Sequence, residues 1–287
     1  MRTMVLGVGA QKSATTWLFK QISKSTGFRA GLCKEYHLFD FLHLNGFVNV
    51  RNNIPRRIRN MFPHESSNLL RQSERKLLSF YKDQKSYFDY FDSILTSKDH
   101  FSSDITPSYA GLPSEVLFEI KNEFERRNIN LKIIFIMREP ITRTESSIKM
   151  EHRRNNGISE INTATMTKNM YRALSDELVK MRNNYAYTCQ QIDKVFSPNE
   201  VFYTFYETLF SASEINRLSL FLNMKTNEFD TSHIVNSSKK LFNYRNEDMT
   251  NFKSLVEEQY QFITDRFNFD IALWNKATAQ ITSGTEV

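Results

Sequence analysis

The sequence predicts an α/β fold in which helices flank one central parallel sheet. Short apolar runs of strand character alternate with longer segments of helical periodicity, as in parallel sheets whose strands are joined by crossover helices. The run at 131–137 is apolar almost throughout, which is typical of a central strand buried on both faces. A glycine-containing turn follows the first run and leads into the first helical segment, the place where many loops bind phosphate.

The first half of the chain begins with an apolar strand at 3–8, and a helix at 15–25 follows the turn. A shorter strand is expected near 28–30. Residues 45–98 carry many arginines among aromatic side chains and have helical periodicity, so we interpret them as a helical excursion from the sheet. The strand at 100–105 ends just before a proline, which cannot continue a ladder.

In the second half, a helix at 113–127 precedes the central strand, and another helix starts at about 140. The remaining elements are helices near 166–183 and 185–196, a strand at 200–205, and helices near 213–223 and 247–267. We find no internal repeat and no linker-like composition. The sequence therefore predicts one domain over 1–275 and a polar, frayed tail over 276–287.

The composition suits a globular protein that binds anions. With 287 residues, the chain is long enough to fold without disulfides or structural metals. Its net charge of +6 favours anionic ligands in general. Cys33 and Cys189 lack CxxC spacing, as expected for reduced thiols in a cytoplasmic protein, and no apolar stretch approaches the ~20 residues of a transmembrane helix.

The turn after the first strand, residues 7–17, is the strongest local signal. Its backbone amides and the start of the helix form a site for an anion, to which Lys12 adds a positive charge and Ser13 a hydroxyl. It is not a Walker A loop, because Gln11 stands where glycine should precede the lysine. Alone, the turn fits an unusual kinase loop, a structural turn or a phosphate loop of another kind.

A second signal follows the central strand. An NTPase or kinase places an aspartate there to hold Mg²⁺, but this strand ends in Arg138, a bidentate phosphate binder. Ser146 lies about two helical turns further on, so it can face the same groove. The pattern predicts an anion site without a metal, although it also fits an ordinary helix cap with a surface arginine.

Together the two segments resemble the sulfotransferases that use 3′-phosphoadenosine 5′-phosphosulfate (PAPS). Gln-Lys-Ser-Ala-Thr-Thr-Trp at 11–17 is similar to their 5′-phosphosulfate loop, and Arg138 through Ser146 is similar to their 3′-phosphate motif. Lys-Glu-Tyr-His-Leu-Phe-Asp at 34–40 resembles a segment of the carbohydrate branch, which includes the heparan sulfate enzymes. Segments 103–109 and 201–209 resemble that branch too, in the expected order.

Two features depart from the carbohydrate branch. Ile105 replaces a lysine that the sugar-modifying enzymes often carry, and the paired cysteines of their C-terminal loop are absent. Both departures count against a Golgi location and against heparan sulfate as the acceptor.

The resemblance implies transfer of a sulfonate group from PAPS to a hydroxyl, or less commonly an amine, of a glycan, lipid or small metabolite. The residues implied for the donor nucleotide are Lys12, Ser13, Ala14, Thr15, Thr16 and Trp17 at the phosphosulfate, Arg138 and Ser146 at the 3′-phosphate, and Lys239 and Lys240 as a clamp. Lys12 would also offset charge that develops during transfer.

The segment at 34–40 supplies the candidate bases. By resemblance Glu35 is the general base, and His37 is the alternative because imidazole titrates near neutral pH. Lys34, Asp104 and Tyr109 are placed on the acceptor side, with a purely structural role for Asp104 equally open. The arginine-rich stretch at 51–76 either guides an anionic acceptor or is a solvated helix face.

Two rival functions were weighed. A P-loop kinase is disfavoured by the missing glycine before Lys12 and by the missing aspartate after the central strand. A basic nucleic-acid-binding protein is disfavoured because the chain has neither a lysine and arginine stripe nor a recognisable reading motif. We therefore expect an enzyme without a nucleic-acid partner.

Overall fold

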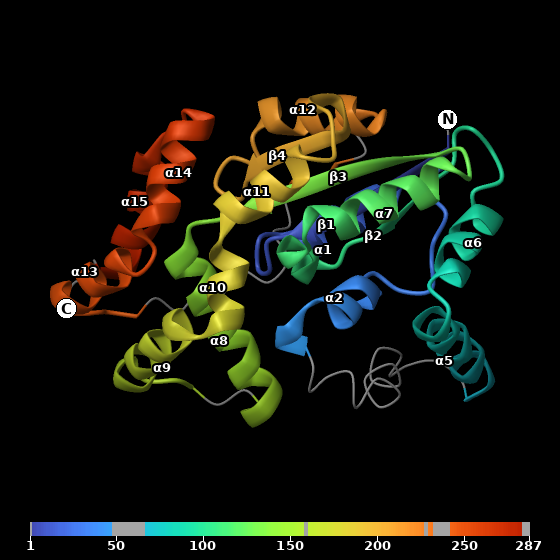
Figure 1. Ribbon diagram of the computed structural model, residues 1–287. Helices are drawn as coiled ribbons and strands as arrows, with labels where there is room; N and C mark the ends of the chain where they lie inside the picture. The colour runs from blue at the N-terminus through green and yellow to red at the C-terminus, as the bar shows by residue number, and fades with distance from the viewer. Residues whose placement is uncertain (1, 48–66, 158–159, 227–228, 232–241, 283–287) are drawn as a thin grey trace.

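The computed structural model describes residues 2–282 except 48–66, 158–159, 227–228 and 232–241. Its centre is a four-stranded sheet with the order β2-β1-β3-β4, and all three strand pairings are parallel (Figure 1). The strands are β1 (Arg2–Gly9), β2 (Phe101–Asp104), β3 (Ile129–Met137) and β4 (Val201–Phe205). The predicted α/β class, with the apolar run as an inner strand, is confirmed.

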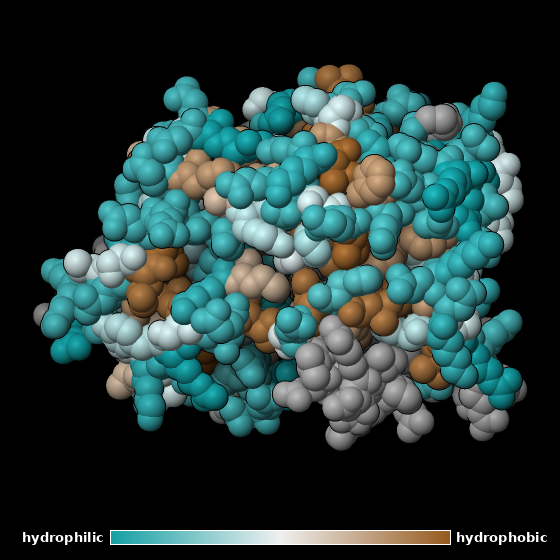
Figure 2. All heavy atoms as spheres, in the orientation of Figure 1, coloured by the Kyte–Doolittle hydropathy of each residue, from teal (hydrophilic) through white to brown (hydrophobic). Residues whose placement is uncertain are grey.

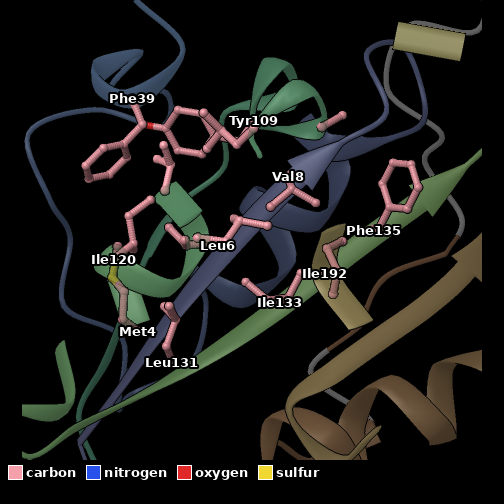
Figure 3. Packing of buried hydrophobic residues seen from close by; sticks show 14 of the residues in the cluster. Met4, Leu6, Val8, Phe39, Tyr109, Ile120, Leu131, Ile133, Phe135 and Ile192 are labelled. Atoms are coloured by element: carbon pink, nitrogen blue, oxygen red, sulfur yellow. The ribbon is translucent and has the colours of Figure 1, made fainter. Parts of the chain in front are cut away.

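The sheet is covered on both faces because its inner strands alternate between two hydrophobic clusters. Met4, Leu6 and Val8 of β1 join Leu131 and Ile133 of β3 in the larger cluster. Figure 3 shows these side chains together with Phe39, Tyr109 and Ile120, which cover this face. The intervening residues of the same strands pack into a second cluster on the other face, with the helices that follow β1 and β4: Val5, Leu18, Ile134, Ile136 and Leu218.

The helices and 3₁₀ turns connect the parallel strands, whose carboxyl ends all lie at one edge of the sheet. They are α1 (Thr15–Ile22), α2 (Leu38–His43), α5 (Ser67–Lys82), α6 (Lys85–Ile94), α7 (Ser114–Glu125), α8 (Pro140–Asn156), α9 (Thr163–Ser175), α10 (Glu177–Asn183), α11 (Tyr185–Asp193), α12 (Ala212–Leu222), α13 (Asn246–Ser254), α14 (Glu257–Phe267) and α15 (Ile271–Thr282), with 3₁₀ turns η1 (Asn45–Phe47), η2 (Pro107–Gly111) and η3 (Pro198–Glu200). Because all strands run the same way, the loops after β1, β2, β3 and β4 meet at one edge of the sheet, where α/β proteins bind ligands.

Four elements differ from the sequence prediction. The helix expected over 247–267 is divided into α13 and α14. The strand expected at 28–30 is a single bridge between Phe28 and Phe101. The helix expected over 166–183 is divided at Asp176, whose carboxylate accepts hydrogen bonds from the first amides of α10 and so starts a new helix. The tail expected from 276 is helical to Thr282, because Trp274 and Thr278, one turn apart, are both buried.

The helical excursion predicted over 45–98 begins with η1 and continues after residue 66 with α5 and α6, and residues 48–66 between them lie outside the described residues. Hydrophilic residues cover most of the face seen in Figure 2, with apolar residues in small groups between them. Among the described helices, none combines the length and hydropathy needed to cross a bilayer.

Candidate active site

The phosphate turn, residues 9–16, joins β1 to α1. Gly9 is needed there, because a Cβ atom would come within 3.1 Å of the Pro107 carbonyl oxygen and 3.2 Å of the Ala110 Cβ. Lys12 and Ala14 both have positive φ, 69° and 60°. In the described part of the chain no side chain caps α1, so its first amides are available to an anion. The Ser13 hydroxyl is buried and has no hydrogen-bond partner there.

Positive side chains converge on this turn. The pKa of Lys12 is lowered, first by burial and then by the charges of Arg153, Arg138 and Lys34. The Lys12 Nζ lies 3.7 Å from the Met150 sulfur, and no carboxylate of the described residues pairs with it. A partly buried lysine surrounded by other cations is unfavourable until an anion binds between them.

Arg138 lies against the same turn. Its Nη1 donates to the Lys12 carbonyl oxygen over 2.8 Å, and its guanidinium lies 4.3 Å from the centre of the Tyr206 ring. Its Nε is buried and unpartnered among the described residues. The side chain is therefore held from two sides and keeps a donor for a ligand.

Ser146 is half-buried on α8 and has no hydrogen-bond partner among the residues that the structure describes. Its neighbour Ser147, which the sequence did not single out, donates to the Gln11 side chain over 3.2 Å. That bond attaches α8 to the phosphate turn. The assignment of Ser146 to the same site as Arg138 stays a prediction.

Lys34 contacts the phosphate turn, although the sequence placed it on the acceptor side. Its Nζ lies 3.3 Å from the Thr15 hydroxyl, 3.2 Å from the Thr16 hydroxyl and 2.6 Å from Glu35 Oε1. Glu35 is therefore one side chain away from the turn. The backbone that presents both residues is bound to the end of β2, since Ile105 N donates to the Lys34 carbonyl oxygen over 2.8 Å.

His37 lies between two carboxylates. Its Nε2 is 3.2 Å from Glu35 Oε2, and its Nδ1 is 2.7 Å from Oδ2 of the fully buried Asp40. Burial disfavours the imidazolium, but the hydrogen bonds to Asp40 and Glu35 outweigh burial and raise the pKa of His37 to about 9. The sequence motif at 34–40 includes Asp40, but sequence reasoning assigned it no function. Its position three residues after His37 is the signal that could have identified it as the partner of the imidazole.

Glu35 has the opposite shift. Burial favours its neutral form, but the hydrogen bond to His37 and the charge of Lys34 lower its pKa to about 2. At neutral pH the pair is a carboxylate beside an imidazolium. These protonation states favour Glu35 over His37 as the candidate base.

Asp104 and Tyr109, which the sequence places on the acceptor side, are both buried. The Asp104 carboxylate accepts hydrogen bonds from the Tyr36 amide and from three hydroxyls, those of Tyr87, Thr106 and Tyr109. Burial raises the pKa of Asp104 to about 6, because it outweighs these hydrogen bonds, which lower the pKa. Of the two roles left open for Asp104, the contacts fit the structural one: it fixes the backbone that leads to His37.

The Trp17 indole is 1% exposed, donates to the Asp230 carbonyl oxygen over 2.8 Å and packs edge-on against Phe210, so this side chain anchors α1. The remaining predicted contacts, Lys239 and Lys240, lie outside the described residues.

The described residues contain no cluster of three or more His, Cys, Asp or Glu side chains arranged to hold a metal ion. Two solved structures of sulfotransferases are similar to this fold. A sulfotransferase from Alicyclobacillus acidocaldarius matches with a TM-score of 0.59 and 15% identity, over 96% of this chain and 99% of that one. The sulfotransferase domain of the olefin synthase of Synechococcus PCC 7002 matches with a TM-score of 0.48 and 13% identity, over 94% of this chain and 95% of that one.

No protein-family model matches the chain, and no curated protein matches its sequence. The likeness to the Alicyclobacillus structure extends over nearly the full length of both chains, so this chain has the sulfotransferase fold. The similarity to the carbohydrate branch stays a prediction.

Proposed function

We propose that the protein is a sulfotransferase that moves a sulfonate group from PAPS to an acceptor hydroxyl. The observation that carries the proposal is the group of cations at the phosphate turn, Lys12, Lys34 and Arg138, with the ionised Glu35 beside it. The fold supports the same function. The acceptor class (a glycan, a lipid or a small metabolite) and the cytoplasmic location stay predictions.

The residues present fit an anionic donor. Ser13 Oγ and Arg138 Nε are buried donors that have no acceptor within the described residues, and Lys12 has no carboxylate partner among them. Buried donors without partners are costly, and phosphate oxygens would satisfy them. The turn amides, Lys12, Ser13 and the hydroxyls of Thr15 and Thr16 would hold the 5′-phosphosulfate, whereas Arg138 and Ser146 would hold the 3′-phosphate.

The chemistry required of the chain is positioning, charge stabilisation and removal of one proton. Sulfonate transfer is an in-line displacement in which negative charge grows on the departing phosphate, so Lys12 and Lys34 lie where that charge develops. Glu35 takes the proton of the acceptor hydroxyl. His37, bound to Asp40, orients the Glu35 carboxylate.

The first expected result concerns the nucleotide. The product 3′-phosphoadenosine 5′-phosphate (PAP) should bind more tightly than adenosine 5′-phosphate (AMP), because only PAP gives Arg138 a phosphate to bind. A hydrogen bond to a charged group contributes about 1.5–3 kcal/mol, so PAP should be preferred by roughly 10- to 150-fold in calorimetry. Arg138→Ala should remove most of that preference.

Arg126→Ala is the control, because Arg126 is a largely exposed arginine at the C-terminal cap of α7 and its loss should leave both affinities unchanged. Equal affinity of the wild-type protein for PAP and AMP would remove the 3′-phosphate assignment. An unchanged preference in Arg138→Ala would assign the phosphate to other residues.

A second expected result separates this function from that of a kinase. Turnover of PAPS should persist in excess EDTA, because Lys12, Lys34 and the turn amides provide the positive charge that Mg²⁺ provides in kinases. Thermal shift should be larger with PAP than with ATP–Mg²⁺ or duplex DNA. Loss of turnover in EDTA that Mg²⁺ restores, with ATP–Mg²⁺ as the better ligand, would instead favour a kinase.

A further inference from the structure

Two carboxylates next to Arg138 connect it to the C-terminal helices. Glu139 is fully buried and Glu207 partly so, and neither forms an ion pair with another described residue. Burial raises the pKa of both, and the charge of Glu139 raises that of Glu207 further. Two acidic groups held close together in the interior are unfavourable, and apolar side chains would suffice to dock a helix. The presence of Glu139 and Glu207 in the interior therefore calls for a functional explanation.

The contacts fix the peptide group between Arg138 and Glu139 at both of its polar atoms. The Tyr185 hydroxyl donates to the Arg138 carbonyl oxygen over 2.6 Å, and the Glu139 amide donates to Glu207 Oε1 over 3.0 Å. Because a peptide group is planar, holding its oxygen and its nitrogen sets its orientation and thereby the position of the Arg138 Cα. From that Cα, the Arg138 side chain extends to the Lys12 carbonyl oxygen and the Tyr206 ring.

The C-terminal helices complete this arrangement with one donor each. Trp274 of α15 donates through Nε1 to Glu207 Oε2 over 3.1 Å, and Tyr260 of α14 donates through its hydroxyl to Glu139 Oε1 over 2.8 Å. Glu139 also accepts the amides of Ile141 and Thr142, so Tyr260 is bound to the residue that starts α8. Figure 1 shows α14 and α15 beside β4, at the edge of the sheet furthest from β2.

We infer that Tyr260 and Trp274 are positioning residues which, through Glu139 and Glu207, place Arg138 for recognition of a nucleotide 3′-phosphate. The C-terminal helices thus take part in selecting the nucleotide besides covering the sheet. This inference rests on the proposed function, in which Arg138 contacts that phosphate.

The test compares PAP with AMP as calorimetric probes of the full-length protein. Tyr260→Phe removes one hydroxyl and keeps the ring, so the AMP affinity should stay within about twofold. The PAP affinity should fall roughly 3- to 10-fold, the range expected for one hydrogen bond. Trp274→Phe is the second variant and should give the same selective loss. In an Arg138→Ala background, Tyr260→Phe should have no further effect on PAP binding.

Tyr171→Phe is the matched control, because the Tyr171 hydroxyl donates to Asp248 over 2.9 Å between α9 and α13. It should lower the melting temperature and leave the PAP-to-AMP ratio unchanged. If Tyr260→Phe and Trp274→Phe weaken PAP and AMP equally, or if the loss persists without Arg138, the two residues only dock the helices and the inference is wrong. If wild-type protein does not prefer PAP, the proposed function fails, and the inference fails with it.

Discussion

Replacing Glu35 with glutamine should lower kcat roughly 10²–10⁴-fold, the usual contribution of a general base. Glutamine keeps an oxygen that can accept the Lys34 hydrogen bond, which in the native site is 2.6 Å long. It cannot accept a proton. Because Glu35 contacts Lys34 and His37 and is assigned to no phosphate, the PAP affinity should change little. Turnover with labelled PAPS and calorimetry with PAP measure the two quantities separately.

His37→Ala should cost less turnover than Glu35→Gln and should act more on the acceptor KM. It should also change the pH dependence. In the native site the pKa of Glu35 is about 2, where burial is outweighed by the His37 hydrogen bond and by Lys34. Without the imidazolium, the pKa of Glu35 rises, so protonation of the base should reduce the rate at higher pH than in the wild-type protein. The acid limb of the pH–rate profile should therefore move toward neutral pH.

Glu119→Gln is the control for both variants, since Glu119 is exposed on α7 and should leave kcat unchanged. Near-normal turnover of Glu35→Gln together with an inactive His37→Ala would reverse the roles and make His37 the base. Normal turnover of both variants would show that the segment at 34–40 is structural and that the active site lies elsewhere.

The fold could be predicted from the sequence because its signals are local. An apolar run such as 131–137 can be buried on both faces only inside a sheet, and a turn with glycine at position 9 marks the point where the first strand ends. The errors in the elements have local causes too. Asp176 caps a new helix within an otherwise periodic segment, and the buried face of α15 is formed by only a few residues.

The candidate site was predicted less completely, because a motif gives residue types but not the direction of a side chain. Lys34 was placed with the acceptor, yet it reaches across to the hydroxyls of the phosphate turn. Asp104 lies at the carboxyl end of a strand, as Arg138 does, but its carboxylate accepts hydrogen bonds from buried hydroxyls. Contacts between distant segments, such as Trp274 with Glu207, leave no signal in either segment alone.

Lys12→Met should separate activity from stability. In the proposed reaction Lys12 offsets the charge that develops on the departing phosphate, so turnover should fall roughly 10²–10³-fold, as when a group that stabilises such charge is removed. The increase in melting temperature caused by PAP should shrink as well, because the ligand loses its most central cation. Methionine matches the length of lysine, and both are strained to the same degree at the positive φ of this position.

The ligand-free variant should be at least as stable as the wild-type protein. Burial and the charges of Arg153, Arg138 and Lys34 lower the pKa of Lys12. The folded state therefore binds this proton less tightly than the unfolded state, and at neutral pH the charged Lys12 destabilises the fold. Lys20→Met, at an exposed position of α1, is the control and should change neither turnover nor the response to PAP. A Lys12→Met protein that unfolds more readily but retains turnover would assign Lys12 to the fold instead of the transfer step.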